Sequence, residues 1–497
     1  MIGSLRRSIR CVVTRLEVVT DRQLFACSVL WVVTTGLALQ LIVLPYITPF
    51  AHAGHGLIAN LDIPGFHAMA VEMAQRTRME GFRDWGHWRT FDYNYPVAIN
   101  SLFYLIYPEP WITLPFNGVL FGIVVVAVRR VVTVLSDSRG VALAGLFPFF
   151  IFPSFIVIWG QPHRDLITGT GFSLVLCALV LAAYRSGKAA RLPVLAILAG
   201  TGMAVMWVSR PYALSLVAAG TLAFMTLALV TKHCHRGRLL TVTAVVLLAA
   251  FVNIKGWTEE RLARVDPDPG SFAPAVAGPV PAESVRNPPA APDSETASGD
   301  DDAPSGWSSI RWPRSRRVVS AIARSRNCFP PPSTGMADTF LYNLCHVREG
   351  FIVQALAAGA SSGYDYDIRL RSAEDFVAYA PRAVAFALFA PGPQRWGTER
   401  TTLGRLATLF VPFEMIVAYT AFLLALVFGR SRLARLNVWA VAAFCITYIT
   451  IYAFATPQIG GLYRMRAFAF AILISTALAV ALPRPMAPGE RDGKSLH

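Results

Sequence analysis

Long apolar runs, separated by short polar segments that contain arginine, dominate the pattern of this chain. Each run has about 16 to 24 residues, about the length of a helix that crosses roughly 30 Å of hydrocarbon. The pattern predicts an all-α, polytopic transmembrane helical bundle of about ten spans. The predicted spans lie near residues 24–47, 111–128, 141–159, 166–184, 192–208, 211–231, 239–254, 406–428, 438–455 and 467–482.

Composition and charge agree with this class. Charged residues make up 15% of the chain, against about a quarter in soluble proteins, which disfavours an ordinary soluble enzyme. With both termini in the cytoplasm, the short inner segments hold 20 basic and five acidic residues, so the entire net charge of +15 lies there. The excess therefore orients the helices by the positive-inside rule. We expect a multi-pass protein of the cell (inner or plasma) membrane, with the lipid bilayer and no nucleic acid as a partner.

The predicted spans divide the chain into modules. The N-terminal membrane module is 1–254, with a first extracytoplasmic loop at 48–110; the second extracytoplasmic loop is 255–405. The C-terminal module is 406–483, followed by a cytoplasmic tail, 484–497. Composition predicts disorder at 266–308, structure at 336–393, an interfacial helix at 64–78 and a short interfacial or re-entrant helix at 95–107. Cys328 and Cys345 share the second loop, where oxidation is allowed, and are candidates for a disulfide.

An acidic residue, Asp62, follows the first predicted span in the sequence Asn60-Leu-Asp-Ile-Pro-Gly-Phe-His67. A carboxylate at the membrane surface suits a general base for an acceptor hydroxyl, or a ligand for a divalent metal ion. A position two residues before Pro64 also suits the N-cap of the next helix. Both interpretations stay open.

Several basic residues at predicted outer turns run against the positive-inside trend. They are His163, Arg164, Arg210, Arg464 and Arg466, and Asp165 lies beside the first two. Guanidinium groups match phosphate oxygens bidentately, so these arginines suit a lipid-linked phosphate. Asp165 is a candidate second acid, metal ligand or helix N-cap. The alternative is that the arginines pair with Asp62, Asp165 or Glu414.

Three further residues are candidates for substrate contacts. Glu414 lies a few residues into the eighth predicted span, where a charge needs a salt bridge or a wet cavity. Tyr364 and Asp365, in the second loop, suit sugar binding by stacking and hydrogen bonding. The sequence contains no P-loop, dinucleotide fingerprint, serine elbow or zinc-protease motif.

Together these motifs resemble the GT-C superfamily of membrane glycosyltransferases, especially the bacterial, glycosyltransferase family 39-like members of the dolichyl-phosphate-mannose-mannosyltransferase-like group. The resemblance covers about 48–215 and 380–470. It is carried by Asp62 with Phe66-His-Ala-Met-Ala70, Tyr95-Pro-Val-Ala-Ile-Asn-Ser-Leu-Phe-Tyr104, Pro110-Trp111 and Asn117, Phe152-Pro-Ser-Phe155 with His163-Arg-Asp165, Arg210-Pro-Tyr212, and Tyr463-Arg-Met-Arg466.

The resemblance implies transfer of a sugar from a polyprenyl-phosphate donor to a glycan or lipid acceptor on the extracytoplasmic side. It implies Asp62 as the catalytic base and outer arginines as ligands of the donor phosphate. A divalent metal is a possible cofactor, although Asp62 lacks the second acid that often follows it in the family. The alternatives are an O-antigen-type polymerase, whose R-x10-G spacing occurs at Arg348 and Gly359, and a transporter or flippase of lipid-linked sugars.

Overall fold

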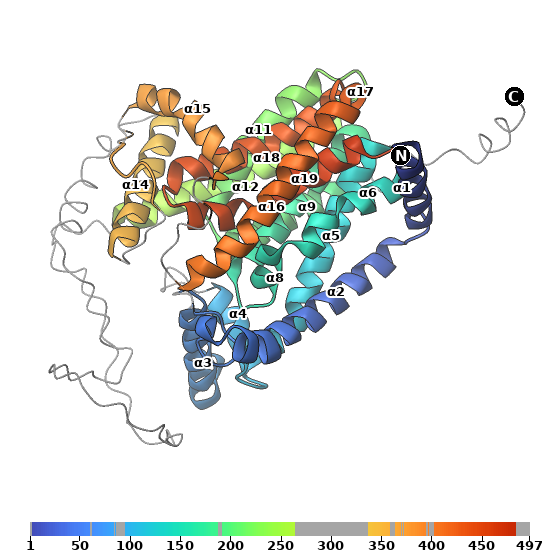
Figure 1. The fold of residues 1–497 in the computed structure, drawn as a ribbon. Helices are drawn as coiled ribbons and strands as arrows, with labels where there is room; N and C mark the ends of the chain where they lie inside the picture. Colours follow the sequence, from blue (N-terminus) through green and yellow to red (C-terminus); the bar gives the residue numbers. More distant parts are fainter. Residues whose placement is uncertain are drawn as a thin grey trace, which may run out of the picture.

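The chain folds into an all-helical bundle (Figure 1), a computed structural model that describes residues 2–59, 62–83, 85, 95–186, 191–263, 336–357, 363–368, 370, 372–393, 396 and 402–483. These residues form helices and two isolated β-bridges, with no strand among them. The helices are α1 (Ile2–Leu16), α2 (Asp21–Ala38), η1 (Leu39–Ile47), η2 (Pro49–Ala51), α3 (Asp62–Glu80), α4 (Tyr95–Tyr104), η4 (Pro110–Thr113), α5 (Leu114–Ser136), α6 (Arg139–Gly145), α7 (Phe147–Ile151), α8 (Pro153–Trp159), α9 (Arg164–Tyr184), α10 (Leu192–Ser209), α11 (Ala213–Leu229), α12 (Arg236–Ala263), α14 (Met336–Ala357), α15 (Ala373–Phe389), α16 (Thr402–Phe428), α17 (Arg430–Leu433), α18 (Leu436–Ala455) and α19 (Ile459–Ala481).

Many of the described helices are long enough to span a membrane. Within the described residues, eight helices are long and apolar enough to cross a membrane, or nine if one bent pair counts as a single span. α11 is apolar but has only 17 residues. Helices of this length and hydropathy indicate a multi-pass membrane protein.

The predicted span at 141–159 is not one straight helix. Arg139–Ile151 and Pro153–Trp159 meet at a bend of 73°. Phe152, between them, has an extended backbone (φ −69°, ψ 120°). Pro153 causes the break because it lacks an N–H and disfavours helical backbone at the residue before it.

The last span begins earlier than the predicted residue 467. α19 begins at Ile459, so Arg464 and Arg466 lie within its first turns and not on the preceding turn, as the sequence predicted. The apolar pattern places the start of this span too late, because charged residues are costly in a lipid-facing helix and the prediction therefore excludes the two arginines. Here both arginines have polar partners inside the fold, which offset that cost.

α9 lies in the interior of the bundle, where its membrane-crossing segment is buried throughout. It packs tightly against α10. A Cβ atom on Gly171 would lie 2.4 Å from the Gly202 carbonyl oxygen, and one on Gly202 would lie 2.7 Å from that of Gly171. Small residues at this crossing let the two backbones touch, as membrane helix pairs commonly require.

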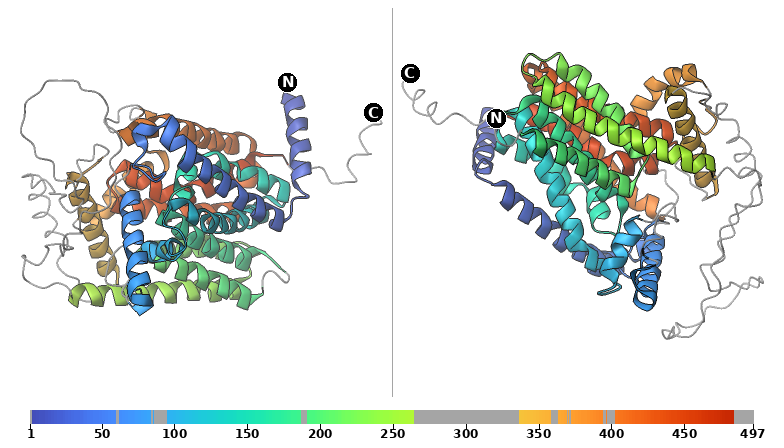
Figure 2. Two further views of the ribbon diagram at one scale, coloured as in Figure 1. Left: turned by 90° about the horizontal axis from the view of Figure 1, so that it is seen from below. Right: turned by 180° about the vertical axis from the view of Figure 1, so that it is seen from behind.

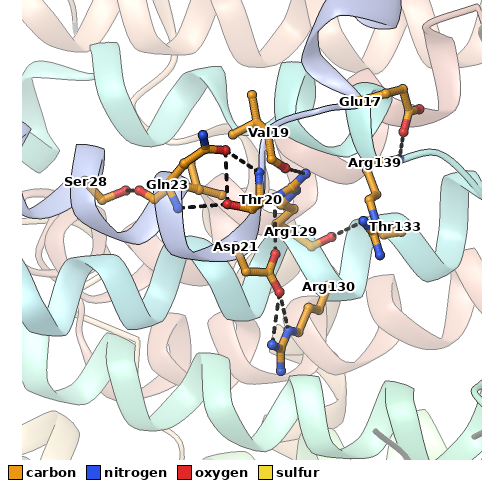
Figure 3. A network of polar contacts seen from close by, with 11 residues as sticks. Glu17, Val19, Thr20, Asp21, Gln23, Ser28, Arg129, Arg130, Thr133 and Arg139 are labelled. Carbon is orange, nitrogen blue, oxygen red and sulfur yellow. Dashed lines mark hydrogen bonds and ion pairs between the residues drawn. The ribbon is translucent and has the colours of Figure 1, made fainter. Parts of the chain in front are cut away.

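A polar network secures one end of the bundle (Figure 3). The buried guanidinium of Arg129, on α5, donates to Asp21 at 3.1 Å and to the Val19 carbonyl at 2.5 Å. Arg130 donates to the same carboxylate at 3.0 Å. Glu17 accepts from the backbone N–H of Arg139 at 3.2 Å. These bonds fix the elbow between α1 and α2 against α5 and α6.

The helices of the two predicted loops lie toward the other end of the bundle, away from α1 and α17 (Figures 1 and 2). The helix predicted at 64–78 is confirmed as α3, and the short helix predicted at 95–107 is α4. α14 and α15 confirm that 336–393 is structured in large part. The segment 266–308 and the tail 484–497 lie outside the described residues. Cys345 is disulfide-bonded. Cys328, the other cysteine of the predicted disulfide, lies outside the described residues.

Candidate functional site

Asp165, in the first turn of α9, is the centre of a buried group of charged side chains. Its carboxylate accepts a hydrogen bond from Nη2 of Arg210 and lies 3.2 Å from Nε of Arg464. The side chains of Asp165 and Arg210 are 5% and 1% exposed, so little water screens their attraction. We call Asp165, His163, Arg164, Arg210 and Arg464 the Asp165 cluster.

Three helix ends supply the cluster. α10 ends at Ser209, because Arg210 precedes a proline and its backbone is pushed out of the helical region. The Ser209 hydroxyl lies 2.9 Å from that of Thr168, which ties the end of α10 to the start of α9. Nη1 of Arg210 donates to the Tyr212 hydroxyl at 2.6 Å. Arg464 reaches the same place from α19.

His163 is the N-cap of α9 and is neutral. Its Nδ1 accepts the backbone N–H of Asp165 at 3.1 Å. An acceptor nitrogen carries no proton, so its 3.1 Å approach to the Asp165 carboxylate is not an ion pair. Burial lowers the pKa of His163; the positive charges of the neighbouring arginines lower it further, while Asp165 opposes them. The arginines therefore carry the positive charge of the cluster.

A small cavity adjoins the cluster. Asp165, Arg210 and Arg464 line it together with Thr168 and aromatic or apolar residues of α9, α18 and α19, namely Phe172, Tyr448, Tyr452, Met465 and Phe468. It has room for about one water molecule. Within the described residues of the cluster, Arg210 Nε is buried without a hydrogen-bond partner, whereas Asp165 Oδ2 faces Arg464 Nε at 3.2 Å. A ligand group that accepts a hydrogen bond, such as a hydroxyl oxygen, suits Arg210 Nε.

The first predicted loop lies against the cluster. The guanidinium of Arg164 lies 5.6 Å from the ring centre of Phe66, on α3. Asp62 occupies the position one helical turn before Phe66, on the same side of α3. Its side chain lies outside the described part of the structure, so the contacts of the predicted base stay a prediction.

Gln161, a residue that sequence reasoning did not single out, joins this loop to the cluster. It is fully buried. Its side chain accepts the N–H of Ile58 at 3.2 Å and donates to the Gly56 carbonyl at 3.1 Å. The sequence offers no signal for this role of Gln161 beyond the position of an amide side chain at a predicted turn. The bonds hold residues 56–58 beside the turn that carries His163 and Asp165.

Glu414 lies elsewhere, at the break between α7 and α8. It is 3% exposed and accepts from the backbone N–H of Ser154 at 2.7 Å, from the Ser154 hydroxyl at 2.9 Å and from the Tyr463 hydroxyl. Ser154 is the second residue of α8, so the carboxylate caps that helix and faces its positive end. The residue does not line the cavity beside Asp165.

Arg466, Tyr364 and Asp365 also lie apart from the cavity lining. Arg466 donates to carbonyl groups at the end of α15. Tyr364 donates to backbone carbonyls at the end of α18. Asp365 accepts from Arg382 Nε at 2.7 Å and from the Tyr379 hydroxyl at 2.9 Å. The structure thus brings Arg464, but not these three residues, to Asp165.

A second group of titratable side chains lies between α3 and α4. Nδ1 of His55 is 3.1 Å from the Glu109 carboxylate, and Nδ1 of His67 is 3.0 Å from the Tyr104 hydroxyl. Burial lowers the pKa of His67 to about 4, and the charge of His55 lowers it as well, while Glu109 opposes this. The sequence offers no reason to pair these residues.

The Asp165 cluster does not fit a divalent cation, because its carboxylate faces guanidinium groups and not further acids. In the part of the chain that the structure describes, no group of three His, Cys, Asp or Glu residues is placed to hold a metal ion. No protein-family model, curated protein or solved structure matches the chain.

Proposed function

We propose that this protein is a membrane glycosyltransferase that moves a sugar from a polyprenyl-phosphate donor to an envelope glycan or lipid acceptor. The observation that carries the proposal is the convergence of Arg210 and Arg464 on Asp165, from helix ends far apart in the sequence. Such arginines offer bidentate donors to a phosphate group. The resemblance of the surrounding motifs to GT-C glycosyltransferases supports the same function.

The proposed topology has ten crossings, counting α11 and the bent pair, with both termini cytoplasmic. The Asp165 cluster and the helices α3, α4, α14 and α15 then lie on the extracytoplasmic side of the cell membrane. The arginine-rich end shown in Figure 3 faces the cytoplasm, as the positive-inside rule requires.

Arg464 is the residue through which a donor phosphate would enter the cluster. Its side chain is 22% exposed, whereas those of Arg210 and Asp165 are almost fully buried. The adjoining cavity is smaller than a sugar phosphate, so the donor would bind from the exposed side of Arg464. Asp165 would hold Arg210 and Arg464 in place, and Asp62 would take the proton of the acceptor hydroxyl.

The test is transfer of a labelled sugar by the full-length protein in nanodiscs supplied with a polyprenyl-phosphate sugar and acceptor membranes. Arg464→Gln should reduce transfer at least about tenfold, because a charge-assisted hydrogen bond contributes roughly 1.5–3 kcal/mol. The matched control is Arg76→Gln, which removes an exposed arginine whose i,i+4 partner is Glu72. Equal activity of the two variants would refute the role of the cluster.

The same assay separates the alternatives. If Asp62→Asn leaves transfer intact, Asp62 is not the base. A ladder of glycan lengths, in place of a single addition, would identify a polymerase. With the protein in sealed vesicles in place of nanodiscs, movement of the lipid-linked sugar across the bilayer without cleavage of its glycosidic or phosphate ester bonds would identify a transporter.

A further inference from the structure

The segment between α14 and α15 is bonded to the turn between α18 and α19. The Tyr364 hydroxyl donates to the Thr456 carbonyl at 2.9 Å and lies 3.3 Å from that of Ala453. The Tyr364 backbone N–H donates to the Pro457 carbonyl at 3.0 Å. Its ring stacks on Phe386 of α15, with ring centres 4.1 Å apart. A single buried tyrosine thus holds the last turn of α18 and the residues that lead into α19.

Arg348, on α14, reinforces this contact. It is 1% exposed, and its guanidinium donates to the Phe454 carbonyl at 3.0 Å and to the Asp365 carbonyl at 2.8 Å. One bond reaches the end of α18 and the other reaches the segment beside Tyr364. The arginine therefore joins α14, the 363–368 segment and α18 in one network.

Arg466 forms a second connection, from α19 to the end of α15. Its guanidinium donates to the carbonyls of Phe386 at 3.2 Å and Ala387 at 2.5 Å, and to that of Ala390. Carbonyls at the end of a helix lack intrahelical partners and carry partial negative charge, which suits a buried guanidinium. The α14–α15 unit, by which we mean the described residues of 336–393, thus contacts the chain before Arg464, at the α18–α19 turn, and after it, at Arg466.

The two arginines of α19 divide their tasks by position. Residues two apart on a helix point in different directions. Arg466 therefore faces α15, while Arg464 faces Asp165, with its Nε 3.2 Å from the carboxylate. Any shift of the α18–α19 turn would move Arg464 relative to Asp165, which belongs to a different helix.

We propose that the α14–α15 unit is a positioning element that sets the place of Arg464 against Asp165, with Tyr364 as its principal positioning residue. The consequence for donor binding rests on the proposed function. The consequence for the α18–α19 turn does not, since it concerns only contacts within this chain. The two are therefore tested with separate measurements.

The test compares Tyr364→Phe with Tyr379→Phe in the full-length protein in nanodiscs. The first variant keeps the ring stacked on Phe386 but removes the hydroxyl that bonds to the turn. The control, Tyr379→Phe, also removes one hydroxyl from the α14–α15 unit, but that hydroxyl donates to Asp365 and not to the α18–α19 turn. Amide hydrogen exchange of residues 456–466 should become faster in Tyr364→Phe only, with α9 unchanged.

Kinetics then show whether the positioning serves donor binding. Tyr364→Phe should raise the donor KM about 3- to 10-fold with kcat unchanged, as expected for loss of one hydrogen bond that supports binding. General destabilisation would instead lower the amount of active enzyme, and so kcat. In an Arg464→Lys background the same substitution should change KM less than about twofold, because Tyr364 acts through Arg464.

Each result decides the inference. Unchanged exchange in Tyr364→Phe, or an equal change in Tyr379→Phe, overturns it whatever the activity. Faster exchange with an unchanged donor KM in an active enzyme overturns the link to Arg464. If the wild-type protein transfers no sugar, the proposed function fails, and the exchange measurement alone upholds or overturns the positioning of the turn.

Discussion

Replacing Asp165 by asparagine should strongly destabilise the folded protein. The substitution keeps the shape of the side chain but removes the negative charge between Arg210 and Arg464. Because Arg210 is 1% exposed, it would be left as a buried guanidinium without its carboxylate. Removing one partner of a buried ion pair costs about 3–5 kcal/mol of unfolding free energy. We expect a loss of unfolding free energy at the lower end of this range, because Arg464 is 22% exposed and keeps some solvation.

The assay is reversible unfolding by a denaturing detergent, followed by circular dichroism. Asp137→Asn is the control, because Asp137 pairs with Arg435 at 3.1 Å while the two side chains are 59% and 40% exposed. An exposed pair contributes at most about 1 kcal/mol. The double variant Asp165→Asn/Arg210→Gln should recover part of the loss, since it removes the unpaired charge as well. Equal costs for the Asp165 and Asp137 variants would refute the inference that the cluster is held by a buried ion pair.

Two further predictions concern the first loop. Because the pKa of His67 is lowered to about 4, the unfolded chain binds the extra proton first as pH falls, so the unfolding free energy should decrease from about pH 6.5 to about 4. His67→Asn should flatten this decrease in the same detergent titration; an unaltered slope would contradict it. Gly56→Ala should destabilise more than Gly54→Ala. Both glycines have positive φ, but only at Gly56 would the Cβ meet a neighbour, 2.6 Å from the Gln40 carbonyl oxygen, whereas Gly54 has open space. Equal losses would show that this contact relaxes.

The sequence predicted the helices well and their interruptions poorly. Apolar runs mark spans because the cost of placing a residue in hydrocarbon is mostly a property of that residue. The break at Phe152 and the early start of α19 depend in addition on contacts with side chains of other helices. Glu414 caps α8 after the break, and Asp165 compensates Arg464 inside the last span. Both partners come from other helices, which hydropathy does not register.

The candidate site was predicted in part. Arginines that oppose the positive-inside trend are visible in one dimension, and two of them, Arg210 and Arg464, do meet at Asp165. Arg466 carries the same signal but bonds to the end of α15. The two arginines of α19 look alike in sequence, and only the direction each takes from the helix distinguishes them.

By itself, the sequence determined that the chain forms helices in a membrane. Its long apolar runs and low charge favour a membrane, and a single run of this length satisfies its own backbone N–H and C=O groups in hydrocarbon when it is a helix. The tertiary structure determined which charged side chains meet. Which carboxylate faces which guanidinium depends on how α9, α10 and α19 pack, and the bond between Arg210 and Asp165 joins residues 45 positions apart. Partners at that separation are set by helix packing, which local sequence does not encode.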